Sequence, residues 1–292
     1  MINPSNKDSH TASGLVHGNF HRVDNFKLNR SSLIRFIILS LLIWVLNLIV
    51  QQAFPTDTDF PFIIRNLFAA TTVLLLVHIS KRELAKNDIY FGALGITFSF
   101  ITARNLFFGM LMAVIVLALF GSIVCVFVPF HFEAGSLSGT NAFKHSISFL
   151  VTNTLEELIF RGCALLILSK MYGWRKAVLF LALPFGLFHL YGLGLSIAGL
   201  KMVLTTASYS FIFCYAYIVT ESIITAISVH WFSNVLLHVL TGLDGEGNAL
   251  LQPMFHVSRP SFDIGLFAFL LSVAIVASLL FFIIRKKENS YD

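Results

Sequence analysis

Charged residues are scarce in this chain. Only 12% of its 292 residues are Asp, Glu, Lys or Arg, whereas a soluble globular domain contains about 25%. Hydrophobic residues make up 57% of the sequence, and the mean hydropathy is +0.81. This shortage of charge excludes an ordinary soluble domain and predicts a polytopic membrane protein. The net charge of +5 is modest, and we attribute it to cytoplasmic loops rather than to nucleic-acid binding.

Cysteine is also scarce. The sequence has three cysteines, all within apolar runs and without CxxC spacing: Cys125, Cys163 and Cys214. A disulfide framework or a cysteine-based metal site is therefore not expected.

The first thirty residues lack an apolar stretch, so we predict no cleavable signal peptide. We interpret residues 1–30, which include His10, His17 and His21, as a polar, disordered cytoplasmic tail.

Long hydrophobic runs, in contrast, are abundant. Runs of about twenty residues indicate membrane-spanning helices. Eight occur here, at residues 33–53, 61–79, 105–128, 144–168, 177–195, 197–219, 222–240 and 262–284. The shorter, glycine-interrupted stretch 89–100 is interpreted as interfacial or re-entrant. We predict an all-α bundle of about eight spans over residues 31–292, with no internal repeat and no second soluble domain.

Positive charges predict the orientation of this bundle. Lys and Arg gather before the first run, between the second and third, between the fourth and fifth, and after the last. The opposite loops hold mainly acidic residues, such as Asp57, Glu133 and Asp244. With eight spans, all the basic loops lie on one side of the membrane. The 219–222 turn is nearly uncharged and gives no information about the orientation. Both termini are therefore predicted to be cytoplasmic.

Three ionisable residues interrupt the run 144–168: Glu156, Glu157 and Arg161. Each costs roughly 2.5–3.5 kcal/mol near the centre of a membrane helix. Glu157 and Arg161 are four residues apart, so they share a helix face and can pair. Glu156 points about 100° away from Glu157 and has no counter-ion nearby on its own helix. It must therefore face other polar groups inside the protein.

Polar residues from two other runs are expected at the depth of Glu156. A rise of about 1.5 Å per residue places His189, His230 and Asn234 in the same layer of the bilayer. His230 and Asn234 are also four residues apart and share a face. Buried ionisable side chains normally face the bundle interior and mark a functional site. His238, one turn beyond Asn234, is not included in this site.

These polar residues also have simpler interpretations. A single intramembrane histidine such as His189 is often a helix–helix hydrogen-bonding group, and Asn234 alone is typical of interhelical contacts. Glu156, His189 and His230 also form a donor set suited to zinc or a similar cation. The occurrence of all of them at one depth favours a functional site.

Three short motifs resemble those of one family. Glu156-Glu157-x-x-x-Arg161 is similar to the EExxxR motif of the CPBP intramembrane proteases, which include the type II CAAX prenyl endopeptidases and the Abi proteins. Phe185-x-x-x-His189 is similar to the FxxxH motif of that family, and His230-x-x-x-Asn234 to its HxxxN motif. All three occur in family order on separate predicted helices. The resemblance covers about residues 144–241, and residues 1–104 carry no matching motif.

This resemblance implies a helix bundle with a hydrolytic cavity inside the membrane. Glu156 would activate water, His189 would bind or polarise that water, and His230 with Asn234 would complete the site and stabilise the oxyanion. Glu157 and Arg161 would hold the motif helix in place. The resemblance does not decide whether Zn²⁺, held by Glu156, His189 and His230, takes part.

The expected substrate is a hydrophobic or lipidated peptide, of which a CAAX-like peptide is one candidate, cut in or at the lipid bilayer. We expect an integral membrane protein of a bacterial cytoplasmic membrane; the oligomeric state is not predicted. Two alternatives stay open: a transporter or proton-coupled carrier that uses the same polar layer, and a non-catalytic immunity or binding protein. The lack of a repeat between the two halves argues against the transporter, and the intact set of polar residues argues against the non-catalytic protein.

Overall fold

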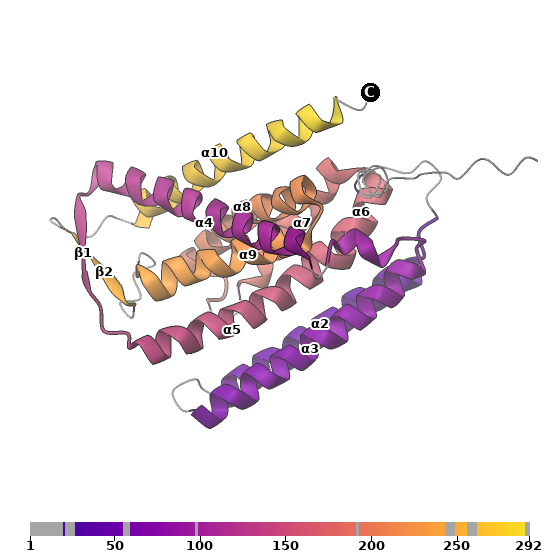
Figure 1. The fold of residues 1–292 in the computed structure, drawn as a ribbon, viewed down its shortest axis with the longest axis horizontal. Helices are drawn as coiled ribbons and strands as arrows, with labels where there is room; N and C mark the ends of the chain where they lie inside the picture. The colour runs from indigo at the N-terminus through magenta and orange to yellow at the C-terminus, as the bar shows by residue number, and fades with distance from the viewer. Residues whose placement is uncertain are drawn as a thin grey trace, which may run out of the picture.

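The chain forms a bundle of long helices (Figure 1). The computed structural model describes residue 20 and residues 27–54, 59–96, 99–190, 193–242, 249–255 and 262–289. Its helices are α2 (Arg30–Ala53), α3 (Asp59–Ala85), the 3-10 turn η1 (Phe91–Leu94), α4 (Phe100–Phe127), α5 (Gly139–Glu157), the π-helix η2 (Leu158–Ala164), α6 (Leu165–Tyr172), α7 (Trp174–Phe188), α8 (Ile197–Thr220), α9 (Ile223–Asn234), the π-helix η3 (Val235–Leu240) and α10 (Phe262–Glu288).

Six of these helices are long and apolar enough to cross a membrane. They are Arg30–Ala53, Phe60–Ala85, Phe100–Phe127, Ile197–Thr220, Ile223–Leu240 and Ile264–Glu288. Two predicted spans do not qualify. The run with the acidic motif is divided by η2 and carries buried charges, and α7 has only 15 residues. At 1.5 Å per residue α7 is shorter than a bilayer core of about 30 Å. The count of eight spans and the cytoplasmic placement of the termini therefore stay predictions.

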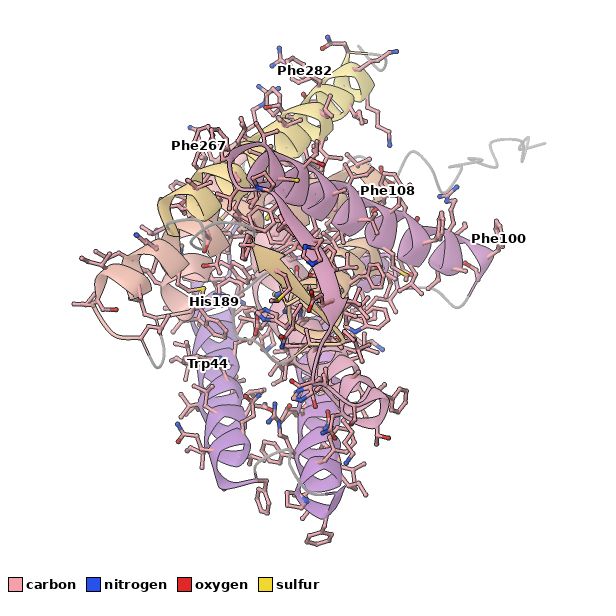
Figure 2. The ribbon with its side chains drawn as sticks, turned by 90° about the vertical axis from the view of Figure 1, so that its left-hand side faces the viewer. Trp44, Phe100, Phe108, His189, Phe267 and Phe282 are labelled. Atoms are coloured by element: carbon pink, nitrogen blue, oxygen red, sulfur yellow. The ribbon has the colours of Figure 1, made fainter. Side chains whose placement is uncertain are left out.

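Large apolar side chains cover the outside of the bundle. Phe100 is 84% exposed, Phe282 68% and Phe267 53%, and Figure 2 shows these three on the periphery. Exposed surface of this kind would be unfavourable in water, whereas lipid tails solvate it well. Together with the six apolar helices, it identifies an integral membrane protein.

Helices α2 and α3 form a side-by-side pair along one flank of the bundle, with α5 next to α3 (Figure 1). Asn47 of α2 donates to Thr72 of α3 at 2.9 Å, and Asn66 of α3 donates to Ser148 of α5 at 3.2 Å. Such bonds between membrane helices contribute roughly 0.6 kcal/mol each. On the opposite flank, α10 packs against α4 and α8.

The two outer ends of the described chain meet at one end of the bundle. The indole Nε1 of Trp174, at the start of α7, donates to Glu288 Oε1 of α10 at 2.6 Å. The backbone N–H of Trp174 donates to the carbonyl of Phe20 at 3.2 Å. The Phe20 ring is buried and contacts Tyr217 edge-on at 5.1 Å. Phe20 belongs to the predicted tail 1–30, of which residues 1–19 and 21–26, with all three histidines, lie outside the described residues.

A two-stranded ribbon departs from the predicted all-α fold. Strands β1 (Phe130–Ala134) and β2 (Leu251–Phe255) pair antiparallel, with Phe130 opposite Phe255 and Ala134 opposite Leu251. Both strands follow the ends of hydrophobic runs, where Pro129 in one loop and the polar loop before Leu251 in the other stop helix formation. The ribbon joins the loop between α4 and α5 to the loop before α10.

Gly186 sets the distance between α7 and α8. A Cβ atom added at Gly186 would lie 2.6 Å from the carbonyl oxygen of Val203 and 2.9 Å from the Cβ of Ala207. Both neighbours belong to α8, and one is backbone that cannot rotate away. Glycine therefore permits close packing of these two helices, and it lies three residues before His189.

Candidate active site

The two glutamates lie where α5 changes into the π-helix η2. Glu157 is the last residue of α5. The π-helix Leu158–Ala164 continues directly from it with i→i+5 hydrogen bonding. Residues 158–163 are all buried. The acidic motif is thus held by a fully enclosed helical segment, in a type of helix that occurs frequently at functional sites.

Glu157 and Arg161 form the predicted ion pair. Arg161 Nη1 lies 3.2 Å from Glu157 Oε1, and both side chains are 0% exposed. Arg161 Nη2 also donates to Ser210 Oγ of α8 at 2.6 Å. The guanidinium lies over the Phe185 ring at 4.1 Å from its centroid. The pair was predictable from spacing, whereas Ser210 was missed because no local pattern links the two runs.

His230 is bound to the same carboxylate. Its Nδ1 lies 2.8 Å from Glu157 Oε1, and because a carboxylate oxygen accepts, Nδ1 is the donor. The ring also stacks on Phe213 of α8, with 4.6 Å between centroids and 21° between planes. Glu157 therefore orients His230 in addition to pairing with Arg161, a role that the sequence pattern did not predict.

His189 caps the C-terminus of α7. Its Nδ1 lies 2.8 Å from the carbonyl oxygen of Phe185, which accepts the hydrogen bond. The ring contacts Phe185 and Phe188, with centroid distances of 4.8 and 5.8 Å. Phe188 in turn packs on Trp44 of α2 at 4.2 Å, and Figure 2 labels Trp44 and His189 on neighbouring parts of the bundle. The imidazole is thus fixed, with Nε2 free to face inward.

Both histidines direct Nε2 at Glu156. Glu156 Oε2 lies 3.7 Å from His189 Nε2 and 3.8 Å from His230 Nε2. This oxygen is buried and accepts no hydrogen bond from the residues that the structure describes. In the neutral tautomer that donates through Nδ1, each ring presents the lone pair of Nε2 to this oxygen's surroundings. A water molecule between these three acceptor atoms can donate hydrogen bonds to two of them at a time.

The same three atoms do not fit zinc closely. Zinc bonds of about 2.0–2.1 Å at tetrahedral angles place ligand atoms about 3.3 Å apart. The two separations of 3.7 and 3.8 Å are longer. Over the described ranges, no group of three or more His, Cys, Asp or Glu side chains is arranged to hold a metal ion. We therefore assign no step of a reaction to the predicted Zn²⁺.

Asn234 does not contact the other predicted site residues through a hydrogen bond. It ends α9, one turn after His230, and is half-buried. In the part of the chain that the structure describes, its side chain forms no hydrogen bond. Two side chains that could act as nucleophiles, Ser233 and Cys163, do not face the site. The Ser233 hydroxyl is hydrogen-bonded to Tyr209, and Cys163 is 0% exposed. His238 packs against Phe149, with 5.5 Å between ring centroids.

A cavity opens beside Glu156. It has a volume of about 290 Å³ and lies between α2, α3 and α5. Its lining includes Trp44, Asn47, Leu48, Gln51, Arg65, His145, Ser148, Phe149, Thr152, Leu155 and Glu156. The first five come from residues 1–104, where no motif pointed to a function. The sequence indicated this part of the cavity only weakly, through polar residues within apolar helices.

The comparisons with known proteins address this same region. Residues 139–236 match the family described as Rce1-like, type II CAAX prenyl endopeptidase Rce1-like. The match confirms the predicted resemblance to the CPBP proteases over these residues. We call the matched segment the CPBP core. It makes up about a third of the chain and contains all seven residues of the three motifs. The search of curated proteins finds no match to the chain.

The CPBP core spans α5 to the beginning of η3. It supplies Glu156 and both histidines, whereas α2 and α3, which wall the cavity, lie outside it. The family indicates a protease, and the core contains the carboxylate and the two imidazoles that peptide hydrolysis can use.

Proposed function

We propose that this protein is an intramembrane endopeptidase that hydrolyses a peptide bond with a water activated by Glu156. The observation that supports it most is the approach of two fixed imidazole nitrogens to one buried carboxylate oxygen, at 3.7 and 3.8 Å. The match of residues 139–236 to CAAX prenyl endopeptidases supports the same reaction. The substrate in this proposal is a hydrophobic or lipidated peptide, CAAX-like in type, that reaches the site from the bilayer.

The reaction needs one base and one group that stabilises negative charge. Glu156 takes a proton from water, and the resulting hydroxide attacks the carbonyl carbon of the scissile bond. Asn234 stabilises the oxyanion by donating through its amide, and the Nε2 atoms of the two histidines accept hydrogen bonds from the attacking water. The C–N bond then breaks, and the proton held by Glu156 passes to the leaving amine. Atoms and charge balance without a further reactant.

Glu157 and Arg161 take positioning roles in this scheme. Glu157 holds His230 in the tautomer whose Nε2 lone pair faces the water, through the 2.8 Å bond to Nδ1. Arg161 neutralises Glu157 and ties η2 to α8 through Ser210. The chemistry therefore depends on residues that never touch the substrate.

We place the protein in a bacterial cytoplasmic membrane, with the lipid bilayer as its surrounding partner. No observation favours the carrier or the non-catalytic immunity protein over the endopeptidase. Zinc stays outside this scheme because the separations around Glu156 are longer than zinc ligands require.

Glu156→Gln tests the proposal directly. The amide keeps the shape of the side chain but cannot accept the water proton, so peptide cleavage should be lost while folding and membrane insertion are retained. The measurement is cleavage of a fluorescent prenylated peptide by the purified full chain in detergent. The matched control is Glu133→Gln on β1, where the carboxylate is 57% exposed. Undiminished cleavage by the Glu156→Gln protein would show that the assignment is wrong.

A further inference from the structure

Helix α8 carries none of the three motifs, yet it contacts α9 at two points that are about one turn apart. Phe213 stacks on the His230 ring, with 4.6 Å between centroids and 21° between planes. One turn earlier on α8, the hydroxyl of Tyr209 is hydrogen-bonded to the hydroxyl of Ser233, three residues after His230. All four side chains are buried. We refer to these two interactions as the α8–α9 contacts.

The α8–α9 contacts restrict the rotation of α9 about its own axis. The two helices are antiparallel neighbours, because only residues 221 and 222 separate them in the chain. A single contact would act as a pivot, whereas two contacts at different heights on one face hold the helix in one orientation. This orientation matters because His230 and Asn234 both extend from α9.

Glu157 alone leaves the His230 ring some freedom. Its hydrogen bond to Nδ1, 2.8 Å long, holds one edge of the imidazole, and such bonds tolerate deviations of about 30° from linearity. The Phe213 ring contacts the flat face of the imidazole and therefore opposes tilting. Edge and face are then restrained together. The result is the direction of Nε2, which lies 3.8 Å from Glu156 Oε2.

Phe213 is itself held in place. Its ring is 1% exposed. Tyr209 and Phe185 contact it, with centroid distances of 4.7 and 5.9 Å. The guanidinium of Arg161 lies 5.0 Å from its centroid. A ring enclosed in this way cannot change its rotamer without displacing a neighbour, so Phe213 is a rigid support for the imidazole.

We propose that Phe213 is a positioning residue of the active site, which holds the His230 ring in the plane that directs Nε2 toward the water beside Glu156. Tyr209 assists, because its bond to Ser233 fixes the rotation of α9. This inference deepens the proposed function and rests on it. A residue that only fills space could be replaced by leucine with a loss of stability but without a change in the geometry of His230.

Phe213→Leu tests the proposal, because leucine keeps an apolar side chain and removes the flat face. The full chain purified in detergent is assayed with the fluorescent prenylated peptide. The kcat should fall roughly 10- to 100-fold, as expected when a reacting group is displaced. The KM should stay nearly unchanged, because Phe213 does not touch the substrate.

The second measurement follows His230 directly and does not require activity. Nitrogen chemical shifts of histidine-labelled protein report the tautomer of each imidazole, and the signal of His230 is assigned by its loss in His230→Gln. The unsubstituted chain should show a single tautomer protonated at Nδ1, and Phe213→Leu should broaden or split this signal. Tyr209→Phe keeps the ring and removes only the hydroxyl, so it serves if the leucine variant does not fold. It should broaden the same signal to a smaller extent.

Phe211→Leu is the matched control, because Phe211 lies on the same helix and its ring contacts Tyr215 at 6.1 Å. It should change neither kcat nor the His230 signal. A single tautomer in folded Phe213→Leu, or in Tyr209→Phe where the leucine variant does not fold, overturns the proposal whatever the kcat. If the His230 signal changes as expected but the unsubstituted chain cleaves no peptide, the proposed function fails and the positioning of the ring stands.

Discussion

One carboxylate organises this site at the scale of single residues. Oε1 of Glu157 accepts from Arg161 at 3.2 Å and from His230 at 2.8 Å, and Glu157 is completely buried. Glu156, its neighbour in sequence, instead points to the imidazole Nε2 atoms. Two adjacent residues of the same type thus have different tasks because successive helical residues face directions about 100° apart.

Arg161→Gln should destabilise the protein strongly. The substitution leaves the Glu157 charge buried without its counter-ion, and breaking a buried pair in this way costs about 3–5 kcal/mol. Arg175→Gln is the control: Arg175 also pairs with a glutamate, Glu288, at 2.8 Å, but it is 51% exposed, so its loss should cost about 0–1 kcal/mol. Thermal unfolding of both variants in the same detergent gives the comparison. Equal losses for the two would refute the role assigned to the buried pair.

The sequence predicted part of this residue network. The Glu157–Arg161 pair follows from i,i+4 spacing alone, and the approach of His189 and His230 to Glu156 was anticipated from their common depth. The bond from His230 to Glu157 was not, because depth gives no rotation about a helix axis. Ser210 and Phe213 on α8 were missed for a related reason: both are ordinary residues for an apolar helix until a partner packs against them.

At the scale of elements, the position of His189 depends on how closely α7 approaches α8. Its ring is fixed to α7 through the Phe185 carbonyl at 2.8 Å. The spacing of the two helices is set at Gly186, where a Cβ atom would lie only 2.6 Å from the α8 backbone. Any side chain there must push the helices apart, and the imidazole will move with α7.

Gly186→Ala should therefore lower the cleavage rate. Displacing a reacting group by about 1 Å can cost on the order of 100-fold in rate, and overpacking of this kind typically costs about 1–3 kcal/mol in stability. Gly121→Ala on α4 is the matched control, because a Cβ there would meet nothing within 4 Å. Both variants should be assayed for cleavage and for thermal unfolding. Wild-type cleavage by the Gly186→Ala protein would mean that this contact does not position His189.

The whole molecule was largely predictable as a set of hydrophobic runs. Each predicted run corresponds to a helix whose bounds lie within several residues of those expected, because lipid exposure demands long apolar segments. The runs 144–168 and 177–195 are the least typical, because the first is divided by η2 and carries buried charges and the second forms a helix of only 15 residues. The β1–β2 ribbon and the cavity between α2, α3 and α5 could not be predicted, because each depends on segments distant in sequence coming together.

The arrangement of the chain ends leads to a prediction about topology. Trp174 contacts both Phe20 and Glu288, so the two ends of the described chain lie at the same end of the bundle. Cysteines placed at Lys27 and at Asn289 should both react with a membrane-impermeant maleimide only after the cell is opened. A cysteine at Glu133 on β1 should react in intact cells.

The labelling experiment needs a background that carries Cys125→Ala, because Cys125 is exposed whereas Cys163 and Cys214 are buried. Opposite labelling of Lys27→Cys and Asn289→Cys would contradict the even number of spans.

The bond between Trp174 and Glu288 also has a consequence for synthesis. The two residues are 114 positions apart in sequence, and translation at about 5–20 residues per second separates them by roughly 6 to 23 s. During that interval the start of α7 has no partner from α10. The contact with α10 that fixes the start of α7, the helix that carries His189, is therefore made only at the end of synthesis.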